Sequence, residues 1–299
     1  MKTKLTFIHV LSPLHAGTGQ GVGVIDLPIA REKATNIPYL PGSSVKGTIR
    51  DEFNGEPNQN RIFGPEDASY AGAIQITDQT LLCLPVRSLA GTFAYVTSPY
   101  ILNRLKRDAN LDNTFVVPDV IDGKCVITAN SELKLTDAQV CLEDLDLDFQ
   151  ETETIWAIWL KDKVFSDAAW QDLFVKRFCI ISDNIFSFLL NTATEVTARI
   201  KLQDDTKTTQ QGALWYEEAL PTESILFGMA LSFPNTATGL DDKTIFEQVE
   251  NKLKKNGSPK PLQFGGNATV GRGLCQMSLV DVSESPTTAV SGEENHENP

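Results

Sequence analysis

The segment PYLPGSSVKGTIRDEF, residues 38–53, joins a stiff turn to the start of a helix, and this constrains the local fold more than any other stretch. Its prolines fix an extended approach, and Gly42 permits a tight turn. We expect Ser43 or Ser44 to cap a helix that begins near Val45, because serine hydroxyls accept hydrogen bonds from the unpaired N–H groups of a helix start. The segment therefore predicts a helix N-terminus, a structure that can bind an anion.

The predicted helix has two distinct faces. Val45, Ile49 and Phe53 recur every four residues and are expected to face a core. Lys46 and Arg50 are also four residues apart and share another face, where two cations beside a helix start could hold a phosphate. An ordinary capped amphipathic helix accounts for the same residues, so both interpretations stay open. The lysine is not placed as a nucleotide-triphosphate loop requires, which excludes that motif.

The charge of the chain limits its interactions with nucleic acid. A formal net charge of -13 over 299 residues argues against non-specific binding of nucleic acid, although the distribution of charge matters more than the sum. Five of these negative charges lie between Asp281 and Pro299, in a stretch without lysine or arginine. We expect residues 283–299 to form a disordered acidic tail and residues 1–282 to form one globular domain.

Metal and membrane chemistry are also limited by the sequence. The five cysteines are scattered without a C-x-x-C pair, and the only histidines are His9, His15 and His296. A zinc or multi-histidine site is therefore not indicated, and any metal would bind carboxylates, as Mg²⁺ does. No apolar run approaches the roughly 18 residues of a membrane span, so we expect no membrane partner and a cytoplasmic protein.

Strand and helix patterns alternate along the chain without a repeat, which predicts an α+β fold. We expect a first strand from Leu5, a helix near residues 87–97 followed by a second helix start, and a helix capped by Ser182 or Asp183. Residues 107–165 are expected to be irregular apart from an acidic strand in CLEDLDLDF, residues 141–149. The carboxylates of this strand could bind metal, but they indicate more strongly a solvated face that blocks edge pairing.

Two glycine-rich stretches carry further candidates. GTGQGVGVID, residues 17–26, lacks the G-x-G-x-x-G pattern of a dinucleotide site and ends at Asp26. LQFGGNATVGRGLCQM, residues 262–277, could bring backbone N–H groups and the guanidinium of Arg272 against a phosphate. A simple hairpin turn explains this second stretch equally well.

Five motifs in order resemble the RAMP superfamily of CRISPR effector proteins, most closely the backbone subunits of type III-B, or Cmr, complexes. The motifs are LSPLHAGTGQGVGVIDLPIARE, IPYLPGSSVKGTIRDEF, CLPVRSLAGTFAYVTSPYIL, GALWYEEALP and FGGNATVGRG. The resemblance covers most of residues 1–280, but not the acidic tail or much of 107–165. It implies a modified ferredoxin-like, RRM-like palm with inserted segments at about 54–72 and 107–165 and a protruding β-hairpin thumb at about 195–217.

The resemblance also implies partners and an activity. Several copies would stack along a CRISPR guide RNA beside other Cmr-type subunits, and each copy would cut the paired, complementary target RNA as an endoribonuclease. Such a protein holds its guide through shape and backbone, so it needs a few cations and N–H groups in a groove while the rest of its surface stays acidic.

Particular residues match the family's functional positions. Asp26 falls on the catalytic acid and is the possible ligand of Mg²⁺ or a similar cation, and His15 falls on a histidine near the RNA. Tyr216 and Glu217 could approach the target strand from the thumb, or only pack within it. The residues expected to bind RNA are Ser43, Ser44, Lys46, Arg50, Arg87, Ser88, Gly265, Gly266 and Arg272.

The expected chemistry uses the nucleophile that RNA itself carries, the 2′-OH. Aspartate has an ordinary pKa of about 3.9 and is a weak base at neutral pH, so a metal-assisted or positioning role for Asp26 is favoured. The products would carry a 2′,3′-cyclic phosphate and a 5′-OH. A non-catalytic guide-binding scaffold is the alternative from another class, and a backbone subunit of the Csm type is a third interpretation.

Overall fold

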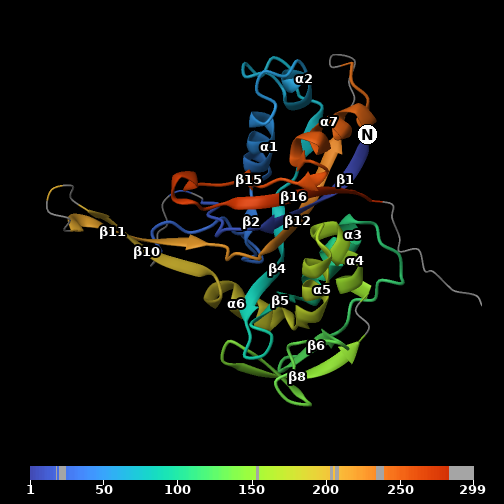
Figure 1. The fold of residues 1–299 in the computed structure, drawn as a ribbon, viewed down its shortest axis with the longest axis vertical. Helices are drawn as coiled ribbons and strands as arrows, with labels where there is room; N and C mark the ends of the chain where they lie inside the picture. The colour runs from blue at the N-terminus through green and yellow to red at the C-terminus, as the bar shows by residue number, and fades with distance from the viewer. Residues whose placement is uncertain are drawn as a thin grey trace, which may run out of the picture.

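A computed structural model of the protein describes residues 1–17, 19, 25–152, 155–202, 205, 209–233 and 239–282. One mixed sheet of 12 strands runs through the molecule in the order β15-β16-β1-β12-β4-β5-β9-β6-β8-β7, with β2 beside β4 and β3 beside β12. Helices lie against this sheet toward both of its ends (Figure 1). The expected α+β class is confirmed.

The first half of the sheet is antiparallel and centres on β1 (Lys2–Val10). β1 pairs with β12 (Ile225–Ser232) on one side and with β16 (Leu274–Asp281) on the other. Residues 4–10 of β1 are all buried, as expected for a central strand covered on both faces. The other strands here are β2 (Tyr39–Leu40), β3 (Ile74–Ile76), β4 (Gln79–Arg87) and β15 (Leu262–Gln263), with β13 (Lys254–Lys255) and β14 (Ser258–Pro259) forming a separate ribbon.

The second half of the sheet corrects two predictions. Residues 87–97 do not form a helix: the chain turns at Gly91 and Thr92, both with positive φ, and continues as β5 (Phe93–Thr97). Residues 107–165 are not irregular, since they contribute three strands and a helix. The acidic strand β8 (Leu145–Thr152) does not block an edge, because it lies between β6 (Lys124–Thr128) and β7 (Gln139–Leu142).

β9 (Phe178–Ile181) links this part of the sheet to the first half, since it pairs with β5 in parallel and with β6 in antiparallel fashion. The helices are α1 (Gly42–Asp51), α2 (Gln59–Phe63), α3 (Pro99–Asp108), α4 (Ile155–Val164), α5 (Ala168–Arg177), α6 (Asp183–Thr192) and α7 (Asp242–Leu253). In Figure 1, α1, α2 and α7 gather at one end of the molecule and α3, α4 and α5 cover the lower half. Within the described residues, no helix is long and apolar enough to cross a membrane.

The helix starts test the capping predictions directly. Ser182 caps α6 as expected, because its hydroxyl accepts from the N–H of Ile185. The cap expected from Ser43 or Ser44 is wrong: α1 begins at Gly42, and the carboxylate of Asp78 accepts the Gly42 N–H at 2.8 Å. Glycine is required at this start, because a Cβ at Gly42 would lie 2.3 Å from the backbone oxygen of Ile76.

The expected core face of α1 is confirmed. Val45, Ile49 and Phe53 are all buried in the main hydrophobic core. Their spacing therefore predicted correctly which side of the helix faces the sheet.

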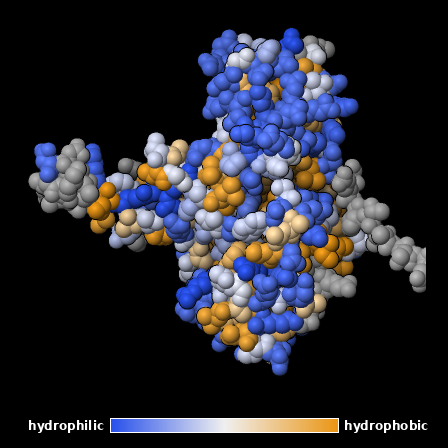
Figure 2. All heavy atoms as spheres, in the orientation of Figure 1, coloured by the Kyte–Doolittle hydropathy of each residue, from blue (hydrophilic) through white to orange (hydrophobic). Residues whose placement is uncertain are grey.

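The expected thumb is the hairpin of β10 (Glu195–Leu202) and β11 (Thr209–Ala219), which projects from the body in Figures 1 and 2. Its register pairs Val196 with Glu218, Ala198 with Tyr216 and Ile200 with Leu214. Because side chains alternate between the faces of a strand, these residues share one face, and the opposite face carries Glu195, Thr197, Arg199, Trp215 and Glu217. Among the hairpin residues whose burial is described, the exposed large apolar side chains are Val196, Ile200, Leu214 and Tyr216, all on the first face.

Candidate functional site

Asp26 lies on the surface at the base of the thumb hairpin. Its carboxylate oxygen Oδ2 accepts the backbone N–H of Tyr216 at 2.8 Å. The next residue, Leu27, donates its N–H to the Tyr216 carbonyl at 3.0 Å, and its carbonyl accepts the Glu218 N–H at 3.0 Å. The segment that follows the glycine-rich stretch therefore runs alongside β11 and holds an exposed carboxylate against the backbone of Tyr216.

Glu218 fixes this segment, and the sequence did not single it out. Its Oε2 accepts the N–H of Ile29 at 3.1 Å, and its Oε1 contacts the guanidinium of Arg31 at 2.5 Å and the hydroxyl of Thr194 at 2.9 Å. The Glu218 side chain is only 4% exposed, so these contacts satisfy a buried charge. The one available signal was its place beside Glu217 in the WYEE motif.

His15 is buried beside the same strand. Its Nδ1 lies 2.7 Å from the carbonyl oxygen of Glu218. A carbonyl can only accept, so Nδ1 carries the proton, and Nε2 of the neutral ring is left as a hydrogen-bond acceptor. A Cβ at Gly17 would lie 2.5 Å from that Nε2, so a larger residue there would displace the ring. The structure thus brings His15 and Asp26 to the same short section of β11.

The second glycine-rich stretch forms the turn between β15 and β16 and supports His15. The N–H of Gly266 donates to the His15 carbonyl at 3.0 Å, and the N–H of Gly273 donates to the Pro13 carbonyl at 2.9 Å. Gly265 has a φ of 67°, and a Cβ there would lie 2.4 Å from the His15 oxygen. The hairpin-turn interpretation describes the observed geometry, and several N–H groups expected to face a phosphate instead hold the loop that carries His15.

Glu217 and Arg272 meet on the opposite face of the thumb from Tyr216. Arg272 donates to the carboxylate of Glu195 at 2.9 Å, and its Nε lies 3.5 Å from Glu217, which also contacts Arg199 at 3.4 Å. The Glu217 side chain is 4% exposed, and its buried carboxylate contacts two guanidinium groups, which balance its charge. These ion pairs fasten the base of the thumb to the glycine-rich turn.

The cations of α1 contact the protein itself. Lys46 donates to the Ile74 carbonyl at 3.0 Å, and Arg50 donates to the carbonyl of Gly64 and to Asn60. Burial, and secondarily the charge of Arg50, lower the pKa of Lys46. Ser43 is exposed and Ser44 half-buried at the helix start. RNA binding by these four residues stays a prediction.

Arg87 and Ser88 lie apart from α1. The N-terminal end of β4 adjoins the helix start, whereas Arg87 ends the strand about 26 Å further along, at roughly 3.3 Å per residue. Arg87 is exposed, while Ser88 is buried and its hydroxyl has no hydrogen-bond partner among the described residues. A single phosphate cannot contact both groups, so an RNA strand that meets both would have to span the palm.

The described part of the chain contains no cluster of three metal-ligating side chains. Asp26 offers one exposed carboxylate, but the neighbouring Glu217 and Glu218 are engaged with arginines. Since Mg²⁺ prefers six oxygen ligands, these residues do not form a magnesium site by themselves.

Comparison with known proteins identifies the family of the chain. A family model of the RAMP superfamily matches residues 7–276. The Cmr endoribonuclease Cmr4 of Pyrococcus furiosus is 35% identical over 96% of this chain and 99% of its own length. The CMR subunit Cmr4 of Saccharolobus solfataricus is 25% identical over 91% of this chain and 94% of its own length.

Solved structures show the same fold. The crystal structure of oligomeric Cmr4 from Pyrococcus furiosus has a TM-score of 0.74 at 29% identity, covering 95% of this chain and all of that one. The likeness confirms the expected RAMP-type palm. With the family model and the full-length relatives in agreement, the chain belongs to the RAMP superfamily and, within it, to the Cmr4 family.

Proposed function

We propose that this chain is the backbone subunit of a type III-B CRISPR effector complex in the cytoplasm. Several copies stack along a guide RNA with other Cmr-type subunits, and each copy cuts the complementary target RNA beside its thumb. The Pyrococcus relative is named an endoribonuclease, and one of its crystal structures is described as oligomeric, which supports both parts of the proposal. The full-length match to Cmr4 relatives favours this assignment over a Csm-type subunit.

The observation that carries the proposal is the fixed position of Asp26 at the base of the thumb. A side chain that acts on a scissile phosphate must be exposed to the RNA and held in one orientation. Asp26 meets both conditions, because it is exposed and its Oδ2 accepts the Tyr216 N–H. The thumb would displace a nucleotide directly next to this carboxylate.

Cleavage proceeds by attack of the RNA 2′-OH on the adjacent phosphorus. The attacking oxygen loses its proton as its bond to phosphorus forms, and the bond from phosphorus to the 5′ oxygen of the next nucleotide breaks. The departing 5′ oxygen takes up a proton from water, which yields a 2′,3′-cyclic phosphate and a 5′-OH. Asp26 orients the hydroxyl or accepts its proton, and general acid–base catalysis of this kind contributes about 10²- to 10⁴-fold. The Nε2 of His15 supplies an acceptor near the same section of β11.

Dependence on a divalent cation is part of the proposal. A cation at Asp26 would complete its ligand set with RNA phosphate oxygens and water, because the described residues offer one carboxylate. No step above depends on the cation. The rival function, a scaffold that binds guide RNA without cutting, uses the same cations and glycines and differs in whether Asp26 reaches the scissile phosphate.

The deciding experiment cuts an end-labelled RNA complementary to the guide with the complete complex, in Mg²⁺ and in EDTA. Evenly spaced products that disappear with Asp26→Asn, while target binding persists, support the nuclease. Asp137→Asn replaces an exposed aspartate between β6 and β7 and is the matched control. An uncut target that stays bound in wild type would identify a scaffold, and cutting in EDTA would remove the metal from the proposal.

A further inference from the structure

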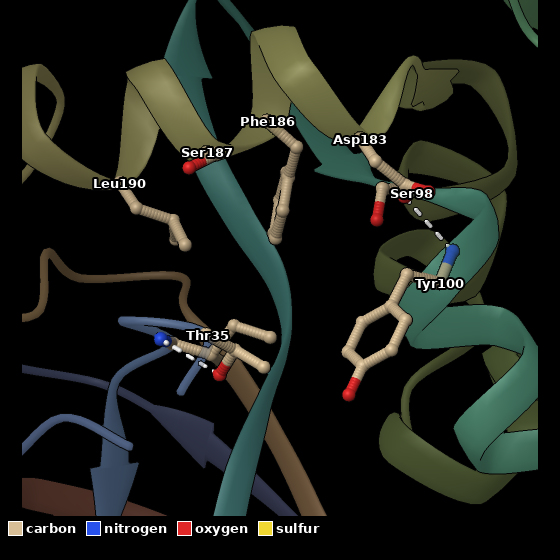
Figure 3. Close-up of a pocket in the computed structure, with 8 residues that line it drawn as sticks. Thr35, Ser98, Tyr100, Asp183, Phe186, Ser187 and Leu190 are labelled. Carbon is tan, nitrogen blue, oxygen red and sulfur yellow. Dashed lines mark hydrogen bonds between the residues drawn. The ribbon is translucent and has the colours of Figure 1, made fainter. Parts of the chain in front are cut away.

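A small cavity lies between α3, α6 and the turn at residues 35–37. It has a volume of about 190 Å³ and is lined by Thr35, Ile37, Ser98, Tyr100, Asp183, Phe186, Ser187 and Leu190. Figure 3 shows α6 supplying one wall and the start of α3 another. The proposed cleavage uses none of these residues.

Ser98 presents a buried hydroxyl to this cavity. The side chain is 1% exposed, and its Oγ has no hydrogen-bond partner among the described residues. In Figure 3 the hydroxyl points toward the space between the rings of Phe186 and Tyr100. A buried hydroxyl without a partner costs free energy, so a ligand that supplies the partner gains that interaction.

Within the described part of the chain, the Ser98 hydroxyl lacks a partner because another residue makes the N-cap hydrogen bond at the start of α3. Ser98 holds the N-cap position, where a serine normally accepts an N–H of the first helical turn. Here Asp183 of α6 does this instead, since its Oδ1 accepts the Tyr100 N–H at 2.9 Å. The Ser98 hydroxyl therefore faces the cavity without a hydrogen bond to any residue that the structure describes, and the Asp183 carboxylate lies beside it.

The remaining lining defines the chemistry of a ligand. The rings of Phe186 and Tyr100 and the side chains of Ile37 and Leu190 form apolar walls, which suit a flat group. Among the described residues, no lysine or arginine lines the cavity, and the carboxylate of Asp183 does, so its charge disfavours a phosphate. An aliphatic side chain would fill the space but would leave the Ser98 hydroxyl unpaired.

We propose that this cavity binds an unpaired nucleobase that carries an exocyclic amine. The base would lie against the rings of Phe186 and Tyr100, its edge would bond the Ser98 hydroxyl, and its amine would donate to the Asp183 carboxylate. Aromatic walls with polar groups at the edges are the usual means of holding single bases. Uracil, which lacks the amine, is bound more weakly than adenine.

The site is tested by ligand-observed saturation-transfer NMR on the full chain, with adenosine and uridine as probes. Ser98→Ala removes the hydroxyl without removing any hydrogen bond that the described residues make, so its thermal stability should equal or exceed the wild-type value. We expect it to weaken adenosine binding about fivefold, the effect of one lost hydrogen bond. Ser187→Leu narrows the lined opening and abolishes binding.

Phe188→Ala is the matched control, because Phe188 lies on the same helix, is 54% exposed and does not line the cavity. Tighter binding of hexa-adenylate than of adenosine identifies an RNA base as the natural source, and equal binding identifies a free nucleoside or nucleotide.

Three results would overturn the proposal. They are the absence of adenosine binding to wild type at millimolar concentration, undiminished binding to Ser98→Ala, and equal binding of uridine and adenosine. A change in self-association of Ser187→Leu without nucleoside binding would likewise overturn it and assign the cavity to a protein partner.

Discussion

The carboxylate of Asp26 accepts a hydrogen bond of 2.8 Å from the backbone N–H of Tyr216, a residue 190 positions further along the chain. The bond ties an exposed acid to the base of the thumb, and the neighbouring Leu27 pairs with the same strand. Orientation of Asp26 therefore depends on the thumb base rather than on its own loop.

A longer side chain at position 26 should show whether cleavage depends on where the Asp26 carboxylate lies or only on its charge. Asp26→Glu keeps the carboxylate but moves it by one methylene, so we expect target cleavage to fall about 10- to 100-fold while target binding is unchanged. Single-turnover cleavage by the assembled complex measures this. A rate equal to that of wild type would show that the placement of the carboxylate is unimportant.

Glu218 should stabilise the thumb base and hold Asp26 in place. Glu218→Gln removes the buried charge opposite Arg31 but keeps an acceptor, so we expect a loss of about 1–3 kcal/mol in the free energy of unfolding. Denaturant unfolding measures this loss. In the assembled complex, Glu218→Gln should lower the kcat of target cleavage and leave the affinity for target RNA unchanged. Glu247→Gln, at a pair whose glutamate is 61% exposed, is the control and should change stability by less than about 0.5 kcal/mol.

The glycine-rich turn should not tolerate a side chain against His15. Gly265→Ala combines a positive φ with a backbone contact of 2.4 Å, whereas Gly257→Ala has a positive φ of 82° and open space. The left-handed conformation alone costs about 1–2 kcal/mol, so Gly257→Ala should lose this amount and Gly265→Ala clearly more. Equal losses of unfolding free energy would mean that the turn relaxes away from His15.

The cations of α1 can be tested by salt dependence. If Lys46 and Arg50 each contact a phosphate, Lys46→Gln and Arg50→Gln should each reduce the slope of log affinity against log salt by about 1. Binding of guide-length RNA to the full chain measures this, and Lys243→Gln, at a lysine that is 81% exposed on α7, is the control. Unchanged slopes would show that Lys46 and Arg50 do not contact phosphates and only bind backbone carbonyls of the protein.

Asp281 should make part of the stability depend on pH. Its hydrogen bond to Lys2, together with the charges of Lys4 and Lys2, lowers the pKa of Asp281 below the ordinary 3.8. A lowered pKa means that the unfolded state binds the proton more readily, so this stabilisation is present above pH 3.8 and is lost as the pH falls toward the lowered folded value.

Asp281→Asn should therefore lower the melting temperature by about 1–3 °C at pH 7. In acid well below pH 3.8, where Asp281 itself is protonated, the variant and wild type should melt together. A difference that persists in acid would point to packing at the end of β16 rather than to the charge of Asp281.

Local patterns determined much of the fold. The apolar spacing of Val45, Ile49 and Phe53 identified the core face of α1, and Ser182 was correctly placed as a cap. These features depend on residues within a few positions of each other, so the sequence alone specifies them.

Only the tertiary structure decided how the site is assembled. The Asp78 carboxylate accepts the first N–H of α1, and the Asp183 carboxylate accepts the N–H that an N-cap side chain would bind in α3. Glu218 and the glycine-rich turn hold the segments that carry Asp26 and His15. In each case the two partners of the hydrogen bond lie far apart in the chain. Hydrogen-bond partners are chosen by proximity after the sheet has formed, and no local periodicity records that choice.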